Sequence, residues 1–142
     1  SVKTRETPKN VDQDVVRVGS GKDKVTTLHN LLTQDHFSKV LIFARTKHGA
    51  EKLARTLLQR GFRAESIHGD KTHASRQRAL KAFKDDQVKI LVATDVAARG
   101  LDIVDVSHVI NFDLPATYND YVHRIGRTGR GNKPGRALTF ID

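Results

Sequence analysis

Short apolar runs and amphipathic segments alternate along most of the chain. Six short segments have the length and composition of strands: 11–18, 40–44, 64–67, 88–94, 109–112 and 137–141. The run 40–44 contains no polar residue, as expected of a strand that is buried on both faces of a sheet.

Between these strands, apolar residues recur at the 3.6-residue period of an amphipathic helix. In the clearest case, Thr46 is a suitable N-cap and Gly61 stands where a helix C-cap is needed. We expect further helices over about 20–32, 74–84 and 118–126. The first ten residues are polar, include a proline and show no period, which indicates a linker over 1–10.

Regular alternation of strands and helices predicts an α/β fold with a mainly parallel sheet covered on both faces. In such folds, ligands bind at the carboxyl ends of the strands. Polar and glycine-rich segments follow the predicted strands at 44–47, 68–71, 94–95 and 99–102. This edge of the sheet is therefore the expected functional edge.

Size and composition exclude several classes of protein. The 142 residues suit one domain. No apolar run approaches the roughly 18–20 residues that span a bilayer, so we expect no membrane association. The absence of cysteine excludes disulfides, thiolate catalysis and cysteine zinc sites. The sequence starts at Ser1 without a signal peptide, and we expect a fragment of a cytoplasmic protein.

The charge balance points to a polyanionic partner. The chain has 25 Lys and Arg against 16 Asp and Glu, a formal net charge of +9. Such an excess attracts nucleic acid above all. Ribosomal proteins and proteins that bind membrane surfaces share this property, so the charge alone does not decide the function.

A basic, glycine-containing run at 123–130 is the strongest local signal. In a helix, His123 and Arg127 share one face, and so do Arg127 and Arg130. Arginine forks suit phosphate oxygens and can neutralise charge on a phosphoryl group in transfer. A solvated basic face is the alternative interpretation, but the interleaved glycines indicate close approach of a ligand or of another backbone.

A second signal follows the most hydrophobic predicted strand. Thr94 can offer its hydroxyl and its backbone N–H to a phosphate at the start of a short helix. Asp102 lies beyond a glycine turn, where a carboxylate can accept hydrogen bonds from ribose hydroxyls. A capping Asp followed by an ordinary turn explains this stretch equally well.

Four motifs in this sequence resemble those of DEAD-box RNA helicases. They are FARTK at 43–47, IHGD at 67–70, ATDVAARGLDI at 93–103 and HRIGRTGR at 123–130, in the family's order and spacing. The resemblance extends over residues 11–142, and the stretch FARTKHGAEKLA is most similar to the bacterial RhlE type. It implies the second of two RecA-like domains of an ATP-dependent RNA helicase.

The resemblance also implies a nucleotide site. Arg127 and Arg130 correspond to the arginine fingers that meet the ATP phosphates, whereas Gly100 and Asp102 would lie at the nucleotide. The expected cofactor is ATP with Mg²⁺, and the Mg²⁺ would be held by the N-terminal RecA-like domain. That domain is also an expected partner.

RNA is the other implied partner. By position, the residues at the RNA sugar–phosphate backbone would be Thr46, Gly69, Lys71 and Thr94. Contacts to sugars and phosphates rather than to base edges predict little sequence preference.

Three further residues complete the implied assignment. Those expected to couple the RNA site to the nucleotide cleft are Asp95, Arg99 and His123. One departure from the family pattern is His73, where a glutamine is usual, and it puts a local RNA contact or helix cap in doubt.

The chain lacks the motifs that grip a triphosphate. The nearest approach to a Walker A sequence is Gly21-Lys22, which lacks the following Ser or Thr and the first glycine, and no Asp-Glu-Ala-Asp run occurs. We therefore expect no ATPase activity from this chain alone. A stand-alone RNA-binding module and half of a DNA helicase or translocase remain alternatives. We expect no metal site, because His68, Asp70 and His73 lack a fourth ligand.

Overall fold

A computed structural model describes residues 10–19, 23–129 and 134–142. Residues 1–9, which make up most of the predicted linker, lie outside the described residues, as does Arg130. The helices and strands, in chain order, are β1 (Val11–Arg17), α1 (Lys24–Leu32), β2 (Val40–Phe43), α2 (Lys47–Gln59), β3 (Ala64–Ile67), α3 (His73–Lys84), β4 (Ile90–Ala93), α4 (Asp95–Ala98), β5 (His108–Asn111), α5 (Tyr118–Ile125) and β6 (Gly135–Ile141).

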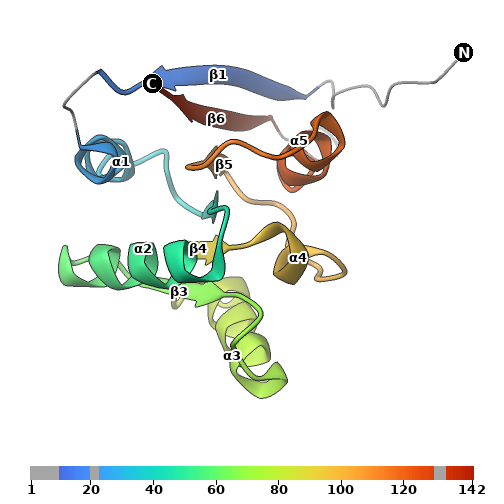
Figure 1. Ribbon diagram of the computed structural model, residues 1–142. Coiled ribbons are helices and arrows are strands. Elements are labelled where there is room, and N and C mark those ends of the chain that lie inside the picture. Colours follow the sequence, from blue (N-terminus) through green and yellow to red (C-terminus); the bar gives the residue numbers. More distant parts are fainter. Residues whose placement is uncertain (1–9, 20–22, 130–133) are drawn as a thin grey trace, which may run out of the picture.

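The six strands form one sheet in the order β1-β6-β5-β2-β4-β3. Every pair of neighbouring strands is parallel, so all the carboxyl ends meet at one edge. The central strand β2 lies between β4 and β5, which places the segments after β2, β4 and β5 side by side (Figure 1). The predicted α/β fold with a parallel sheet is confirmed.

Helices cover both faces of the sheet. Figure 1 shows α1 and α2 on one side and α4 and α5 on the other. Alternate residues of β2 enter two separate cores, because successive side chains of a strand point to opposite faces: Val40 and Ile42 pack with α1 and α2, and Leu41 and Phe43 pack with residues of α3, α4 and α5. All four are fully buried, which explains the uninterrupted apolar run.

Both predicted caps of α2 are present. The Thr46 hydroxyl accepts a hydrogen bond from the Gly49 N–H at 3.0 Å. At the other end, Gly61 has a left-handed φ of +94°, and the N–H groups of Gly61 and Phe62 donate to the carbonyls of Leu58 and Leu57. This pattern is a Schellman motif, and it ends the helix just before β3.

Two strand boundaries differ from the prediction by two residues, and several others differ by one. β4 begins at Ile90 rather than at residue 88, because the Val88 N–H still donates to the Ala82 carbonyl in the turn after α3. β6 begins two residues early, at Gly135, where it pairs with Val11. Apolar composition predicts the central residues of both strands. The turn after α3 determines where β4 begins, and pairing with β1 determines where β6 begins.

The doubtful position 73 does not affect the helix cap. α3 begins at His73, and its N-cap is Thr72, whose hydroxyl accepts from the Ser75 N–H at 3.1 Å. The unusual residue therefore leaves the capping of this helix intact.

A buried histidine at the start of β5 links stability to pH. His108 is 3% exposed and stacks on Phe37 with 3.8 Å between ring centroids. Its Nδ1 pairs with the Ser107 hydroxyl at 2.9 Å, and its buried Nε2 has no partner among the described residues. Burial, helped by the charges of His36 and Arg136, lowers the pKa of His108 to about 4.

We predict an acid-induced loss of stability that depends on this residue. Folding favours neutral His108, so its contribution is complete above pH 6.5 and is lost as the pH falls towards 4. The loss should be on the order of 2–3 kcal/mol. Urea unfolding followed between pH 7 and pH 4 measures it, and a His108→Phe variant should show a flatter profile over that range. Replacing exposed His48 by Gln serves as the control and should leave the slope unchanged; equal slopes in all three proteins would contradict the prediction.

Candidate functional site

Three of the predicted site residues line one cavity, and the Arg127 carbonyl there accepts from the N–H of Val106, which lies just before β5. Asp102, His123 and Arg127 line a space of about 340 Å³ between α5 and the segment that follows α4. His123 and Arg127 also border a narrow gap against α4, together with Asp95 and Arg99. The residues predicted for the nucleotide and for coupling are therefore close together.

A buried guanidinium joins α4, α5 and the segment after β5 at the carboxyl edge of the sheet. Arg124, on α5, is 1% exposed and forms two hydrogen bonds of 2.7 Å to the carboxylate of Asp95, the first residue of α4. Its Nη1 also donates to Asn111 Oδ1 at 3.2 Å and to the Asp113 carbonyl at 2.7 Å. The guanidinium carbon lies 5.0 Å from the centre of the Phe43 ring. Sequence reasoning placed Arg124 only in a basic run, because nothing in the motif signals its burial.

Asp113 extends the same network to the segment after β2. One carboxylate oxygen accepts from the Arg45 N–H at 2.8 Å, and the other pairs with the Lys24 ammonium at 3.2 Å. The ends of β2 and β5 and the start of α1 are therefore tied together by one aspartate. No motif in the sequence marks this residue either.

The predicted finger Arg127 is bound to its own domain. α5 ends at Ile125, so Arg127 lies beyond the helix. Its Nη2 donates to the Ala98 carbonyl at 2.9 Å, and its Nη1 donates to the Leu101 carbonyl at 2.7 Å. These contacts span the turn at Gly100, whose φ is +82°, so Arg127 holds the turn that carries the predicted nucleotide residues.

The remaining residues of this group lie near the surface. Asp102 is exposed and forms a long ion pair of 3.9 Å with Lys84. Arg99 pairs with Asp120 of α5 at 3.4 Å, which adds a second, more exposed link between α4 and α5.

The predicted RNA residues follow three neighbouring strands, β2, β4 and β3. The Thr46 hydroxyl is engaged as a helix cap. Thr94 precedes α4, and its hydroxyl forms no capping bond. The expectation that its backbone N–H is offered to a phosphate is wrong, because this N–H donates to the Ile67 carbonyl at 3.3 Å. Gly69 and Lys71 lie in the turn after β3.

A carboxylate that sequence reasoning missed lies beside this turn. Glu51 of α2 accepts hydrogen bonds from His68 Nε2 at 2.8 Å and from the Ser66 hydroxyl at 2.9 Å, and it lies 3.4 Å from the Lys71 ammonium. The hydrogen bond with His68 is the largest of several effects that lower the pKa of Glu51 to about 2. Glu51 is therefore ionised at neutral pH.

Among the described residues, no group of three or more His, Asp and Glu side chains could hold a metal ion. The pairing of His68 with Glu51 accounts for one member of the triplet considered in the sequence. No helix in the described ranges is both long and apolar enough to cross a membrane.

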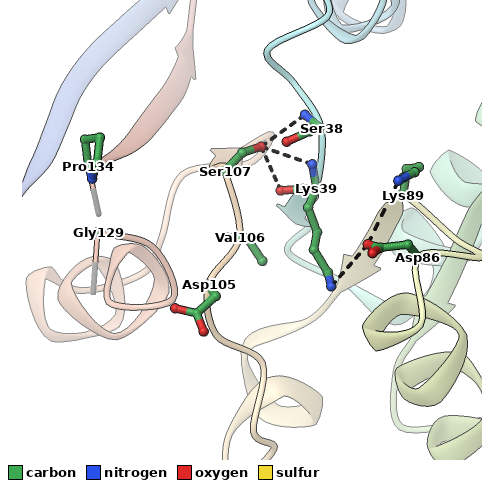
Figure 2. A pocket seen from close by; sticks show the side chains of 9 residues that line it. All are labelled: Ser38, Lys39, Asp86, Lys89, Asp105, Val106, Ser107, Gly129 and Pro134. Atoms are coloured by element: carbon green, nitrogen blue, oxygen red, sulfur yellow. Dashed lines mark hydrogen bonds and ion pairs between the residues drawn. The ribbon is translucent and has the colours of Figure 1, made fainter. Parts of the chain in front are cut away.

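Another cavity, of about 360 Å³, lies at the opposite edge of the sheet (Figure 2). There the Ser107 hydroxyl accepts from the N–H groups of Ser38 and Lys39 and donates to the Lys39 carbonyl, which ties β2 to β5. The Lys39 ammonium lies 3.5 Å from Asp86. None of the predicted site residues with a described position lines this cavity.

Comparison with known families identifies one domain type. Residues 23–132 match the family model described as the helicase conserved C-terminal domain. This match covers β2 to β5 and all four motifs, whereas β1 and β6 lie outside it.

Solved structures of DEAD-box proteins are similar over nearly the whole chain. E. coli DEAD-box protein SrmB, solved with regulator of ribonuclease activity A, is 34% identical with a TM-score of 0.84, and the match covers 98% of this chain and 79% of that one. A DEAD-box protein from Methanococcus jannaschii is 40% identical with a TM-score of 0.85, over 93% of this chain and 36% of that one. S. cerevisiae Dbp5, solved with RNA and ADP BeF3, is 34% identical with a TM-score of 0.85, over 95% and 36%. The chain thus spans about a third of the longer relatives.

The buried pair predicts a large difference between two Asp→Asn substitutions. Asp95→Asn leaves the Arg124 guanidinium buried without its counter-ion, which should lower the free energy of unfolding by about 3–5 kcal/mol. Asp120→Asn removes the partner of the more exposed Arg99 and should cost less than about 1 kcal/mol. Urea unfolding at neutral pH measures both, and similar costs for the two variants would show that the Arg124 pair does not support the fold.

Proposed function

The chain belongs to the helicase C-terminal domain family, as the C-terminal domain of a DEAD-box helicase, and we propose that it completes the ATPase and RNA sites of an ATP-dependent RNA helicase. The observation that carries this proposal is the gathering of Asp102, His123 and Arg127 around one cavity. The stretch at 43–54 further favours the RhlE type. The other half of the ATP site would come from an N-terminal RecA-like domain.

Arg127 and Arg130 are proposed to meet the ATP phosphates when the two domains close. Arg127 now donates to neutral carbonyls of Ala98 and Leu101. Exchange of these acceptors for charged phosphate oxygens would give shorter and stronger hydrogen bonds. Gly100 and Asp102 would lie at the nucleotide, with the Asp102 carboxylate at the ribose.

Solved structures of related proteins support the proposal that this domain contributes to binding an adenine nucleotide. Prp28 from Chaetomium thermophilum was solved with ADP, and S. cerevisiae Dbp5 with ADP BeF3. The Mg²⁺ that accompanies ATP is assigned to the N-terminal domain by the resemblance to the family, because this sequence contains neither a Walker A motif nor an Asp-Glu-Ala-Asp run.

RNA is proposed to bind beside this site, at Thr46, Gly69, Lys71 and Thr94. All four follow strands that are neighbours in the sheet, and the net charge of +9 favours a polyanion. Closure of the two domains would bend one RNA strand and separate a short duplex, and ATP hydrolysis would reopen the cleft.

Coupling between the two sites is assigned to Asp95, Arg99 and His123. Asp95 is adjacent to Thr94 in the chain and pairs with Arg124 on α5. His123 and Arg99 border the gap between α4 and α5. A movement of Thr94 would therefore reach the cavity through the peptide bond to Asp95 and the ion pair between Asp95 and Arg124.

Two assays separate this function from the alternatives. A stand-alone RNA-binding module would bind RNA and gain no ATPase activity when the N-terminal domain is attached. Half of a DNA helicase would show ATP hydrolysis that single-stranded DNA stimulates as well as RNA does, whereas contacts to the 2′-hydroxyl favour RNA.

We predict that the complete protein loses ATP turnover when either arginine is removed. Arg127→Ala or Arg130→Ala should lower the steady-state ATPase rate by roughly 10³-fold, as expected for loss of a group that stabilises phosphoryl-transfer charge. Arg78→Ala, an exposed arginine of α3, is the control and should keep the rate. Thermal unfolding separates lost chemistry from lost structure in Arg127→Ala, and an unchanged rate in both finger variants would reject the assignment.

A second prediction concerns the RNA affinity of this chain alone. Binding to single-stranded polyuridine should weaken as salt rises, because each neutralised phosphate releases counterions. Lys71→Ala should reduce the slope of log K against log salt by about 1. Lys81→Ala, which removes an exposed lysine paired with Asp85, should leave the slope unchanged. Salt-independent binding would contradict an electrostatic RNA site.

A further inference from the structure

Glu51 places a negative charge beside a surface proposed to bind a polyanion. Its side chain is 26% exposed and lies 3.4 Å from the ammonium of Lys71, one of the proposed RNA residues. By Coulomb's law alone, such a carboxylate weakens the attraction of the site for phosphate. Its presence there calls for another role.

The contacts of Glu51 converge on the turn after β3. Three of its four partners belong to residues 66–71, namely Ser66, His68 and Lys71. The fourth is Arg55 Nε at 2.9 Å, on the same helix. The carboxylate thus joins α2 to the segment that carries Gly69 and Lys71.

His68 passes this constraint on to the backbone of the turn. Its ring is buried, its Nε2 lies 2.8 Å from Glu51, and its Nδ1 accepts from the Asp70 N–H at 3.3 Å. Only a neutral ring with its proton on Nε2 satisfies both contacts. The Lys71 N–H then donates to the His68 carbonyl at 3.1 Å and closes the turn.

An ion pair at the tip of the turn supports the same geometry. The Lys47 ammonium, at the start of α2, lies 3.1 Å from the Asp70 carboxylate. Both side chains are at least half exposed, so this pair contributes little by itself. Most of the restraint therefore comes from the buried contact between Glu51 and His68.

We propose that Glu51 is a positioning residue for RNA binding, which sets the His68 tautomer and holds the 68–71 turn so that Gly69 and Lys71 meet a phosphate. This inference rests on the RNA-binding function proposed above. The Glu51 carboxylate repels RNA phosphate, but it would favour binding by holding the 68–71 turn in the conformation that binds RNA.

Two substitutions separate the effect of the Glu51 charge from the effect of its side-chain length. Glu51→Asp keeps the charge but is one methylene shorter, whereas Glu51→Gln keeps an acceptor for His68 and removes the charge. Glu65→Gln is the matched control, because Glu65 is exposed on β3 and its carboxylate forms no hydrogen bond or ion pair among the described residues. The measurement is fluorescence anisotropy of a labelled polyuridine 10-mer with this chain, at fixed low salt.

Positioning predicts that Glu51→Asp weakens RNA binding about tenfold, and that Glu51→Gln binds within about threefold of the wild-type chain. The ¹⁵N shifts of His68 should report the Nε2–H tautomer in the wild type and in Glu51→Gln, and a tautomer mixture in Glu51→Asp. Glu65→Gln should change neither readout. Thermal unfolding confirms that each variant is folded at the assay temperature.

Tighter binding by Glu51→Gln together with unchanged binding by Glu51→Asp would overturn the inference, since a simple charge effect produces that result. An identical His68 tautomer in all four proteins would overturn it as well. Failure of the wild-type chain to bind the RNA would instead reject the proposed RNA site, and the positioning role with it.

Discussion

The arrangement of the carboxyl edge depends on one buried ion pair, Arg124 with Asp95. Removing two charges from water is costly, and the cost is recovered only where geometry is good and the remaining donors are satisfied. Here the pair is bidentate, and Arg124 also donates to Asn111 and to the Asp113 carbonyl. The pair therefore fixes the first residue of α4 against the last turn of α5. His123 and Arg127 flank Arg124 closely in the chain, so their positions follow from it.

Charged side chains also hold two loops in place by hydrogen bonds. Segments at the ends of parallel strands have few apolar side chains to bury, so charged groups take over. Arg127 spans the turn at Gly100 through backbone carbonyls, and Glu51 spans the turn at Gly69 through His68. Each charged side chain comes from a helix or its end and is directed at a loop. Loop shape at this edge is thus set by directional contacts that a ligand with stronger charges can compete for.

The sequence predicted the fold well because its central strands β2 and β4 are uninterrupted apolar runs and its helices have clear periods. Thr46 and Gly61 could be recognised as caps because the local backbone alone determines their roles. The start of β4 could not be predicted in this way, because Val88 is apolar but is held in the turn after α3. Burial of Arg124 and the contacts of Glu51 were also beyond sequence reasoning, because both depend on partners 29 and 17 residues away. Tertiary contacts of that kind leave no local pattern.

The adjacency of Thr94 and Asp95 restricts how the two halves of the site can move. Thr94 is one of the proposed RNA contacts, and its N–H donates to the Ile67 carbonyl of β3. Asp95, the next residue, is fixed to Arg124 of α5. If Thr94 and Asp95 move relative to α5, the ion pair between Asp95 and Arg124 must break, or α5 must move with them. Because breaking the pair leaves a buried charge uncompensated, the second response costs less, and α5 carries His123 and leads into Arg127. In the proposed coupling, motion at the RNA residues would reach the cavity through these rigid elements.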